Sequence, residues 1–247
     1  MDCYNDFAEI YDVLIDEDIN YEKWAEKIIE ICDAHKVQKR DYLDLACGTG
    51  NFTSIIGKKF VFTTAVDLSD SMLAVAEEKL CEAGIRAKVL CQNISNLKIN
   101  KKFDLITCGL DSTNYLIEDS DIKGYFKSVS EHLKDDGLFI FDINTEYKIK
   151  EVLGNNLYSY DDDDVVYIWD NHFENNVVDM NLTFFVKKGQ VYKRFDEFHR
   201  ERAYSDVELR KYISEAGMKV VETLNAYEDN NIDDYTERAV YVIRKEE

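Results

Sequence analysis

Residues 43–50 read Leu43-Asp44-Leu45-Ala46-Cys47-Gly48-Thr49-Gly50, and the fold expected of the whole chain follows from them. The stretch begins as a short apolar run, typical of a buried strand, and ends in a glycine-rich turn that leads into a helix. The next apolar run ends on Asp67, 19 residues after Gly48. Two glycines let the backbone lie against a ligand where a Cβ would collide, and an acid in this place accepts hydrogen bonds from ribose hydroxyls. The motif therefore predicts an adenosine-type ligand at the carboxyl ends of the strands.

Apolar runs and helical patterns alternate along the first part of the chain. Strands are predicted over residues 42–46, 60–66, 87–91, 103–108 and 138–143. Helices are predicted over residues 6–15, 20–34, 69–84 (with its caps) and 122–133. This alternation is typical of βαβ units, which build a parallel sheet covered by helices on both faces and therefore have apolar strands.

From about residue 158, apolar and polar side chains alternate instead. Asn175-Asn176 and Lys188-Gly189 read as hairpin turns, so a three- or four-stranded antiparallel meander is expected. A capping box at Ser205 then opens a helix, and two strands follow over residues 218–224 and 239–243. We therefore predict one α/β domain of residues 1–145 and 204–247, with an N-terminal helical cap, and an antiparallel β lid or substrate subdomain over residues 146–203.

The turn lacks the features of two other nucleotide-binding loops. A dinucleotide fingerprint needs a third glycine, and the chain has Thr53 at that position. No Lys-[Ser/Thr] pair follows the glycines, so a phosphate-cradling loop is excluded as well. The turn therefore favours a nucleoside without a pyrophosphate.

Five motifs, in order, resemble those of class I S-adenosylmethionine-dependent methyltransferases. They are residues 43–51 with the glycine turn, 65–73 with Asp67, 92–94, 103–108 and 133–137. The resemblance covers essentially the whole parallel domain. It implies a Rossmann-like, seven-stranded methyltransferase sheet, S-adenosylmethionine as the cofactor, and methyl transfer by in-line displacement.

The resemblance also implies roles for single residues. Asp67 would hold the ribose, with Leu68 and Met72 against the adenine. Asn93 stands where the family usually has an aspartate that accepts from the adenine amino group, and its carbonyl can accept that bond without charge assistance. The implied cofactor-binding residues are Tyr11, Asp44, Ala46, Cys47, Gly48, Thr49, Gly50, Asp67, Leu68, Met72, Asn93, Ile94, Gly109, Leu110 and Asp111.

A narrower resemblance is to small-molecule N-methyltransferases, including those that act on amino sugars. It rests on residues 7–12, which are followed by Tyr21 and Trp24, and on the insert after the fifth strand. In those enzymes the N-terminal segment folds over the cofactor, and the insert roofs the active site. The resemblance implies that Tyr11 contacts the cofactor and that residues 109–111 line the cleft.

Substrate contacts are expected after the fourth strand and on the insert. The expected substrate-pocket residues are Ser112, Asn114, Tyr115, Trp169, Arg194 and His199. His199 is also the candidate general base, since a neutral imidazole could take the proton released on methyl transfer. A hydrogen-bonded sheet histidine is the alternative interpretation, and a neutral amine acceptor needs no dedicated base.

Three polar residues, Asp111, Asp142 and Asn144, should lie at neighbouring strand ends, which resembles the site of metal-dependent O-methyltransferases. These side chains equally suit an amine substrate or solvent, so we predict no metal.

Composition narrows the partners. The chain has 50 acidic and 30 basic residues, and its net charge of -20 repels nucleic acid and anionic lipid. The expected partner is a small-molecule substrate, and the expected state is a monomer or a homodimer. The sequence shows no signal peptide, no apolar run of membrane-spanning length, and no C-x-x-C pair among its six cysteines. A cytoplasmic protein with reduced thiols is expected.

The chain contains no proline. It therefore lacks the P-C-x-x-C of zinc deaminases. Among methyltransferases, it lacks the N-P-P-[YF] loop of the nucleobase and glutamine enzymes and the Pro-Cys nucleophile of the cytosine C5 enzymes. We therefore expect direct methyl transfer to a small amine or hydroxyl acceptor. The alternatives left open are a tRNA or protein methyltransferase, a nicotinamide oxidoreductase, and a catalytically silent cofactor-binding module.

Overall fold

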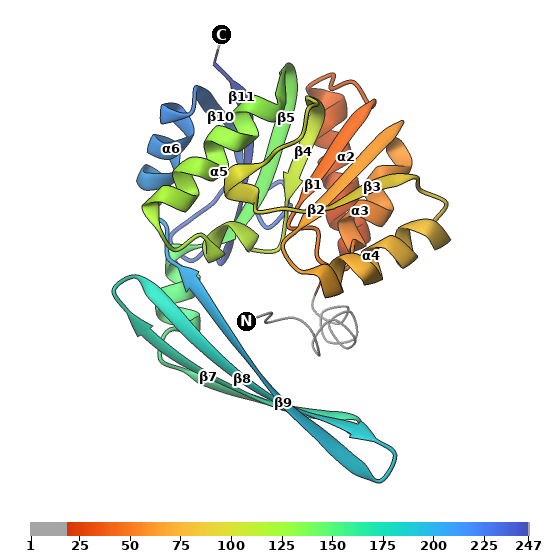
Figure 1. The fold of residues 1–247 in the computed structure, drawn as a ribbon. Helices are drawn as coiled ribbons and strands as arrows, with labels where there is room; N and C mark the ends of the chain where they lie inside the picture. The colour runs from red at the N-terminus through yellow and green to blue at the C-terminus, as the bar shows by residue number, and fades with distance from the viewer. Residues whose placement is uncertain (1–18, 247) are drawn as a thin grey trace.

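The computed structural model describes residues 19–246, and these contain two separate sheets (Figure 1). Tyr11 and the helix expected over residues 6–15 lie outside the described residues. The larger sheet has seven strands in the order β10-β11-β5-β4-β1-β2-β3. Their bounds are Asp41–Leu45 (β1), Phe62–Asp67 (β2), Ala87–Cys91 (β3), Phe103–Cys108 (β4), Leu133–Asn144 (β5), Met218–Asn225 (β10) and Arg238–Lys245 (β11). The predicted Rossmann-like, seven-stranded fold is confirmed.

Five neighbouring strands, from β5 to β3, run parallel, as the alternating pattern predicted. The next strand in the sheet, β11, does not continue that arrangement, because it runs antiparallel to both β10 and β5. The connection between β10 and β11 explains why these two strands pair antiparallel. Residues 226–237 contain no helix, and a parallel pair needs a crossover of a dozen or more residues, usually a helix.

Helices cover both faces of the seven-stranded sheet. Their bounds are Tyr21–Ala34 (α2), Asn51–Ile56 (α3), Asp70–Glu82 (α4), Asp119–His132 (α5) and Asp206–Glu215 (α6). In Figure 1, α5 and α6 lie on one face, where Phe126 and Ile213 join one buried cluster. On the other face, Ile28 of α2 and Ile56 of α3 join a second buried cluster. Among the helices of residues 19–246, none has the length and apolar character that a membrane crossing requires.

Helix starts follow the capping signals in the sequence. The Asn20 side chain accepts from the Lys23 N–H at the start of α2. Ser205 and Glu208 form the complete capping box of α6. Short helical turns complete this part of the chain: Gly57–Lys59 (η1), Ile94–Asn96 (η2), Ser112–Tyr115 (η3) and Lys148–Leu153 (η4, a π-helix).

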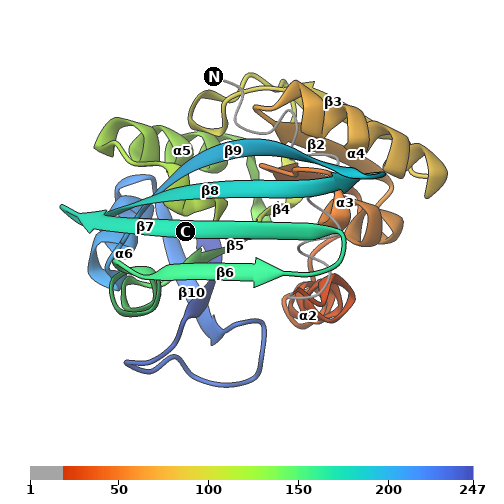
Figure 2. The same cartoon turned by 90° about the horizontal axis from the view of Figure 1, so that it is seen from below.

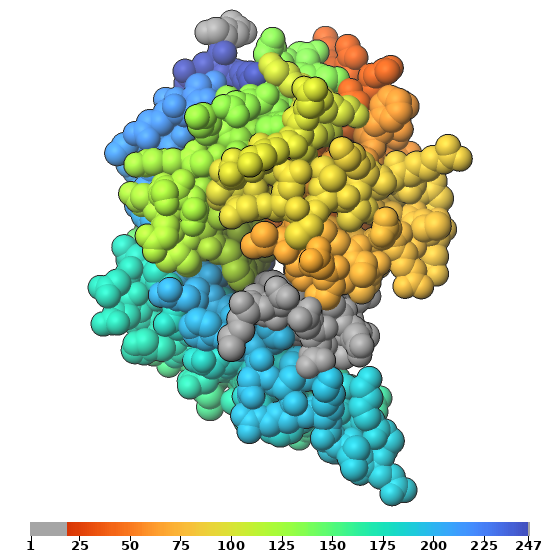
Figure 3. All heavy atoms as spheres, viewed as in Figure 1, coloured from red at the N-terminus to blue at the C-terminus, as the bar shows by residue number. Residues whose placement is uncertain are grey.

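The smaller sheet, which we call the lid, has four antiparallel strands in the order β6-β7-β8-β9. They are Leu157–Asp161 (β6), Val165–Glu174 (β7), Val177–Lys188 (β8) and Val191–Arg202 (β9). Seen from below, the lid crosses under the seven-stranded sheet (Figure 2), and its β8–β9 end extends beyond the rest of the molecule (Figure 3). The predicted antiparallel insert after the fifth strand is confirmed. The division into domains at residues 145 and 204 stays a prediction.

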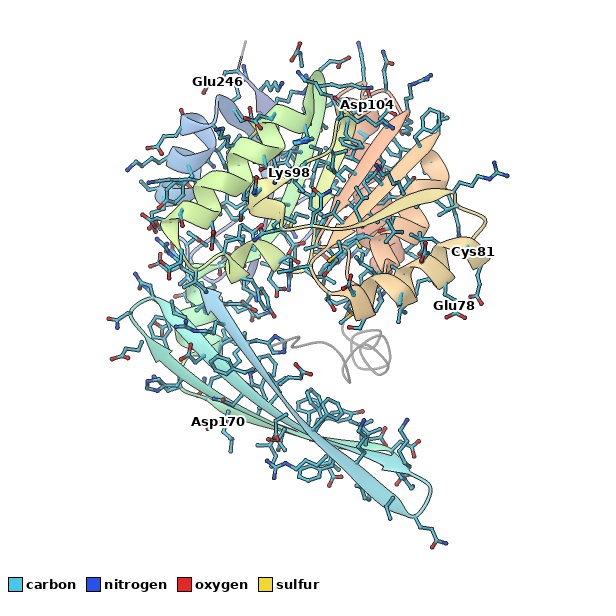
Figure 4. All side chains as sticks on the ribbon, in the orientation of Figure 1. Glu78, Cys81, Lys98, Asp104, Asp170 and Glu246 are labelled. Carbon is cyan, nitrogen blue, oxygen red and sulfur yellow. The ribbon has the colours of Figure 1, made fainter. Side chains whose placement is uncertain are left out.

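The lid has two distinct faces because side chains alternate along its strands. The register places Trp169, Leu182 and Glu197 in one cross-strand row. The next row on the same face ends at His199. On this inner face, Glu201 contacts Asn144 at the end of β5, and Phe184 joins a buried cluster with Met72 of α4. The intervening side chains, such as Asp170 in Figure 4, lie on the outer face.

Asn114 of η3 fastens the lid to the seven-stranded sheet. Its Nδ2 donates to the carbonyl oxygen of Asn144, at the end of β5, at 3.0 Å, and to that of Arg202, at the end of β9, at 2.9 Å. Its Oδ1 accepts from the Asn144 N–H at 3.0 Å. The side chain is fully buried. Its amide is committed to main-chain groups at the junction of the two sheets, and a contact between Asn114 and the substrate stays a prediction.

Asn114→Ala should destabilise the protein by about 2–4 kcal/mol, because three main-chain groups lose a buried partner. Urea unfolding would measure the change. Asn181→Ala, on the exposed outer face of the lid, is the matched control and should cost about 0.5 kcal/mol or less. Equal effects of the two substitutions would contradict the role assigned to Asn114.

Candidate functional site

A cleft opens at the carboxyl ends of β1 and β4. It is lined by Tyr21, Asp44, Ala46, Cys47, Gly48, Thr49, Asn51, Phe52, Gly109, Leu110 and Ser112. Seven of the residues expected to bind the cofactor are among them: Asp44, Ala46, Cys47, Gly48, Thr49, Gly109 and Leu110. In a parallel sheet, this is the edge at which ligands bind.

The glycine turn takes a left-handed path into α3. Gly48 has φ +54° and Gly50 has φ +81°. A Cβ built on Gly48 would meet nothing within 4 Å, whereas one on Gly50 would lie 3.2 Å from the Cβ of Ala76. Gly50 therefore allows close packing on α4, and Gly48 leaves its side of the turn open. This division of roles fits a turn that a ligand approaches at Gly48.

Asp67, at the end of β2, is fixed beside the turn. Its Oδ2 accepts from the Gly48 N–H at 2.8 Å, and its Oδ1 accepts from the Ser69 N–H at 2.9 Å. A carboxylate has about four acceptor positions, so two remain for the hydroxyls of a ribose. Of the two residues expected against an adenine, Leu68 is 67% exposed, whereas Met72 is buried in a cluster with Val165, Phe184 and Val186 of the lid.

Asp44, inside the first motif, is a structural acid at the floor of the cleft. It accepts from the hydroxyls of Thr53 at 2.6 Å and Thr107 at 2.7 Å. Burial raises the pKa of Asp44 to about 6. Thr53 is the residue that replaces a third glycine, and its bond to Asp44 ties the start of α3 to β1.

Asn93 and Ile94 lie at the start of η2, next to the end of β3. The Oδ1 of Asn93 accepts from the Ser95 N–H at 2.8 Å, and the side chain is exposed. The same oxygen has a second lone pair, so a contact with an adenine amino group stays a prediction.

A buried ion network lies behind the end of β4. Arg238, at the start of β11, donates to Asp111 at 2.7 Å and also to Asp142. The two acids of the metal-site alternative are therefore held by an arginine. Among residues 19–246, the structure contains no group of three or more His, Cys, Asp or Glu side chains arranged to hold a metal ion.

The inner face of the lid brings a second acid to Asp111. Glu201 of β9 lies close to Asp111, and its Oε2 accepts from Asn144 Nδ2 at 2.8 Å. Burial, with the nearby charge of Asp111, raises the pKa of Glu201 well above its usual range. The Oδ1 of Asn144 is buried and has no hydrogen-bond donor. This group of side chains is rich in acceptors and is suited to a ligand that donates hydrogen bonds.

His199 lies on the same face, two residues before Glu201. Its Nδ1 is 3.3 Å from the hydroxyl of Tyr115. Burial lowers the pKa of His199 to about 4, against a small opposing effect of Asp111. The ring is therefore neutral at pH 7. Ser112, the third expected pocket residue of this region, lines the cleft and donates to the Gly109 carbonyl at 2.8 Å.

The remaining expectations concern Trp169 and Arg194. Trp169 lies on the inner face, and its indole N–H is buried without an acceptor. Arg194 lies on the outer face, pairs with Asp196 at 2.9 Å and stacks over Phe185. Residues 194 and 199 are an odd number apart, so strand alternation puts them on opposite faces of the lid, and a contact between Arg194 and the substrate stays a prediction.

Phe52, Glu201 and Arg238 are site residues that the sequence patterns did not predict. The ring of Phe52 fills the space where a Gly109 side chain would stand, since a Cβ there would lie 2.5 Å from it. Glu201 could have been found by counting alternate positions from His199 along β9. Arg238 gave no local signal, because its partners are about 100 residues earlier in the chain.

The depressed pKa of His199 predicts a pH-dependent stability. Between about pH 4 and 6.5 the unfolded chain binds the proton and the folded protein does not. This difference lowers the free energy of unfolding. The loss is absent above pH 6.5 and grows as the pH falls, by up to about 1.4 kcal/mol per pH unit. His199→Gln removes it, so the variant should gain on the wild type as the pH falls from 6.5 to 4 in urea titrations. His172→Gln, at an exposed lid histidine, is the control. A constant difference between His199→Gln and the wild type would contradict burial of a neutral ring.

Comparisons with known proteins agree with this geometry. A family model described as "Methyltransferase domain" matches residues 43–137. The chain is 32% identical over 246 residues to the "Putative methyltransferase" of Geobacillus sp. (strain WCH70), covering 98% of this chain and 99% of that one. It is 25% identical over 138 residues, 56% of each chain, to a dTDP-3-amino-3,4,6-trideoxy-alpha-D-glucopyranose N,N-dimethyltransferase of Streptomyces venezuelae.

One solved structure is especially similar. It is a S-adenosylmethionine-dependent methyltransferase from Clostridium acetobutylicum, 51% identical, with a TM-score of 0.94 over 99% of this chain and 100% of that one. With the glycine turn, the acid after β2 and the seven-stranded sheet, these matches show that the chain belongs to the class I S-adenosylmethionine-dependent methyltransferases.

Proposed function

We propose that this enzyme methylates an amine nitrogen of a small molecule in the cleft between the seven-stranded sheet and the lid. The observation that carries the proposal is the acceptor-rich group of Asp111, Glu201 and Asn144 beside that cleft. Asp111 directly follows Leu110 and precedes Ser112, both of which line the cleft. A donor-rich ammonium or amine group is the complement of such a site.

Residues of the first two motifs would hold the methyl donor. Gly48 would allow backbone contact with the nucleoside, and Asp67 would accept from the ribose hydroxyls. When bound, S-adenosylmethionine supplies a methyl group already activated by a positively charged sulfur. The protein then has to align the acceptor nitrogen with that methyl group and exclude water from the cleft, a role that fits the position of the lid.

The proton on the acceptor can be managed by Glu201. A single proton can lie on either partner of the hydrogen bond between the acceptor nitrogen and Glu201. In one form an ammonium group faces the Glu201 carboxylate, and in the other a neutral amine faces the carboxylic acid. The raised pKa of Glu201 favours the second form, in which the nitrogen has its lone pair. The neutral ring of His199, two residues away, is the second group that could accept a proton.

Two further facts support a small amine. The relative from Streptomyces venezuelae carries a name that describes N,N-dimethylation of an amino sugar nucleotide. The net charge of -20 opposes a nucleic acid substrate and favours a cationic one. The proposed substrate contacts are Ser112, Tyr115, Trp169 and His199.

Cofactor binding should raise the melting temperature of the protein. S-adenosylhomocysteine at a hundredfold excess over its Kd should stabilise it by about 2.7 kcal/mol, which is about 5–10 °C for a chain of this size, and NAD should have no effect. Asp67→Ala should lose most of the shift. The control is Asp70→Ala, which removes an exposed carboxylate three residues later. A full shift in Asp67→Ala would exclude Asp67 as the ribose ligand.

Acceptor chemistry can be tested with a panel of small primary and secondary amines and matched alcohols, measuring release of S-adenosylhomocysteine. Amines should stimulate release and the alcohols should not. With an active amine, Glu201→Gln should lower kcat at least tenfold, since the amide cannot take a proton. Glu174→Gln, at an exposed carboxyl of the same lid, should leave kcat unchanged. Activity with RNA or protein alone would overturn the proposed acceptor class.

A further inference from the structure

The carboxylate of Asp142, at the end of β5, is fully buried and accepts four hydrogen bonds. The N–H groups of Leu110 and Asp111 donate to its two oxygens at 2.9 and 2.8 Å. The hydroxyl of Tyr227 donates at 2.6 Å, and Arg238 donates as an ion pair. Each oxygen therefore receives one main-chain and one side-chain donor.

The two main-chain donors lie in an unfavourable backbone conformation. Leu110 has φ +54° and Asp111 has φ +51°, so two consecutive residues with a Cβ lie in the left-handed region. Such a pair persists only where the surroundings hold it. Here, both N–H groups point at one carboxylate, and that is the contact that compensates for the strain.

A second left-handed pair is tied to the same carboxylate. Ala226 has φ +48° and Tyr227 has φ +61°, in the connection between β10 and β11. The Tyr227 ring stacks on Trp24 of α2, with ring centroids 4.6 Å apart, and the Arg238 guanidinium lies over the Trp24 ring, 5.4 Å from its centroid. Asp142 thus joins α2, the C-terminal connection and the end of β4 at one point.

From this arrangement we infer that Asp142 is a positioning residue for the cofactor, although it does not line the cleft itself. It holds residues 109–112 in the path that brings Gly109, Leu110 and Ser112 to the cleft wall, opposite the glycine turn. Arg238 supplies the counter-charge that allows a buried carboxylate at this point. The inference rests on the proposed use of this cleft for S-adenosylmethionine, and it does not depend on the identity of the acceptor.

A structural role alone would also make Asp142 sensitive to substitution, so the test needs a matched carboxylate. Asp104 is such a control. It is buried, accepts from the Asp41 N–H at 2.8 Å and pairs with Lys134 at 2.9 Å. It lies at the other end of β4, and Figure 4 shows it at the edge of the sheet opposite the lid. Asp104→Asn therefore removes a similar buried charge far from the cleft.

The experiment is calorimetric titration of S-adenosylhomocysteine into the wild type, Asp142→Asn and Asp104→Asn. The Asp142 carboxylate accepts one main-chain N–H on each oxygen, whereas an asparagine amide has only one acceptor oxygen. Asp142→Asn should therefore release Leu110 or Asp111 from its left-handed conformation and weaken S-adenosylhomocysteine binding at least tenfold. Asp104→Asn should lower the melting temperature while its Kd stays within about twofold of the wild type. Unchanged binding in Asp142→Asn, or equal weakening in both variants, overturns the inference.

A milder variant covers the case in which Asp142→Asn does not fold. Tyr227→Phe keeps the ring stack on Trp24 and removes one of the four donors, so it should weaken binding about two- to fivefold and leave kcat at saturating cofactor unchanged. Binding equal to that of the wild type overturns the inference here as well. If the wild type does not bind S-adenosylhomocysteine, the proposed cofactor site is contradicted. If it binds the cofactor but methylates no amine, only the proposed acceptor is contradicted.

Discussion

The buried carboxylate of Asp142 is the group on which the geometry of the cleft depends, because it satisfies two strained segments and one buried cation at once. A carboxylate taken out of water is stable only when paired and hydrogen-bonded, and Arg238 and three other donors meet that need. In return, Leu110 and Asp111 stay in a conformation that isolated residues rarely adopt. The end of β4 is thus shaped by contacts from the C-terminal part of the chain.

The lid depends on the same edge of the sheet. Asn114 joins the main chains of β5 and β9, and Glu201 reaches from the lid to Asp111 and Asn144. These contacts are polar, and the acceptors Glu201, Asp111 and Asn144 Oδ1 gather on the buried face between sheet and lid near the lid base. Such a surface has a chemical preference for an amine, and this is the physical basis for the acceptor class proposed above.

Local patterns in the sequence predicted much of this molecule. Gly48, Gly50 and Asp67 were identified because a turn with positive φ and an acid at a strand end leave a compact signature. The alternating pattern from residue 158 predicted the lid for the same reason, since period-two alternation is a property of each strand by itself.

What the sequence did not reveal depends on contacts between distant segments. The antiparallel course of β11 follows from a helix-free connection, and the roles of Arg238 and Asn114 follow from partners on other strands. Arg194 was placed in the pocket by its nearness to His199 along the chain, although alternation separates the two faces. Glu201 had no feature to distinguish it among 50 acidic residues until the register of β9 was known.

The central claim is that the cleft between the glycine turn and residues 109–112 holds S-adenosylmethionine beneath the lid. A crystal structure with S-adenosylhomocysteine tests it most directly. We expect electron density for the nucleoside beside Gly48, with both ribose hydroxyls on Asp67 and with the N–H groups of Leu110 and Asp111 still bound to Asp142. A nucleoside bound elsewhere, or a cleft floor released from Asp142 when the ligand is present, would contradict it.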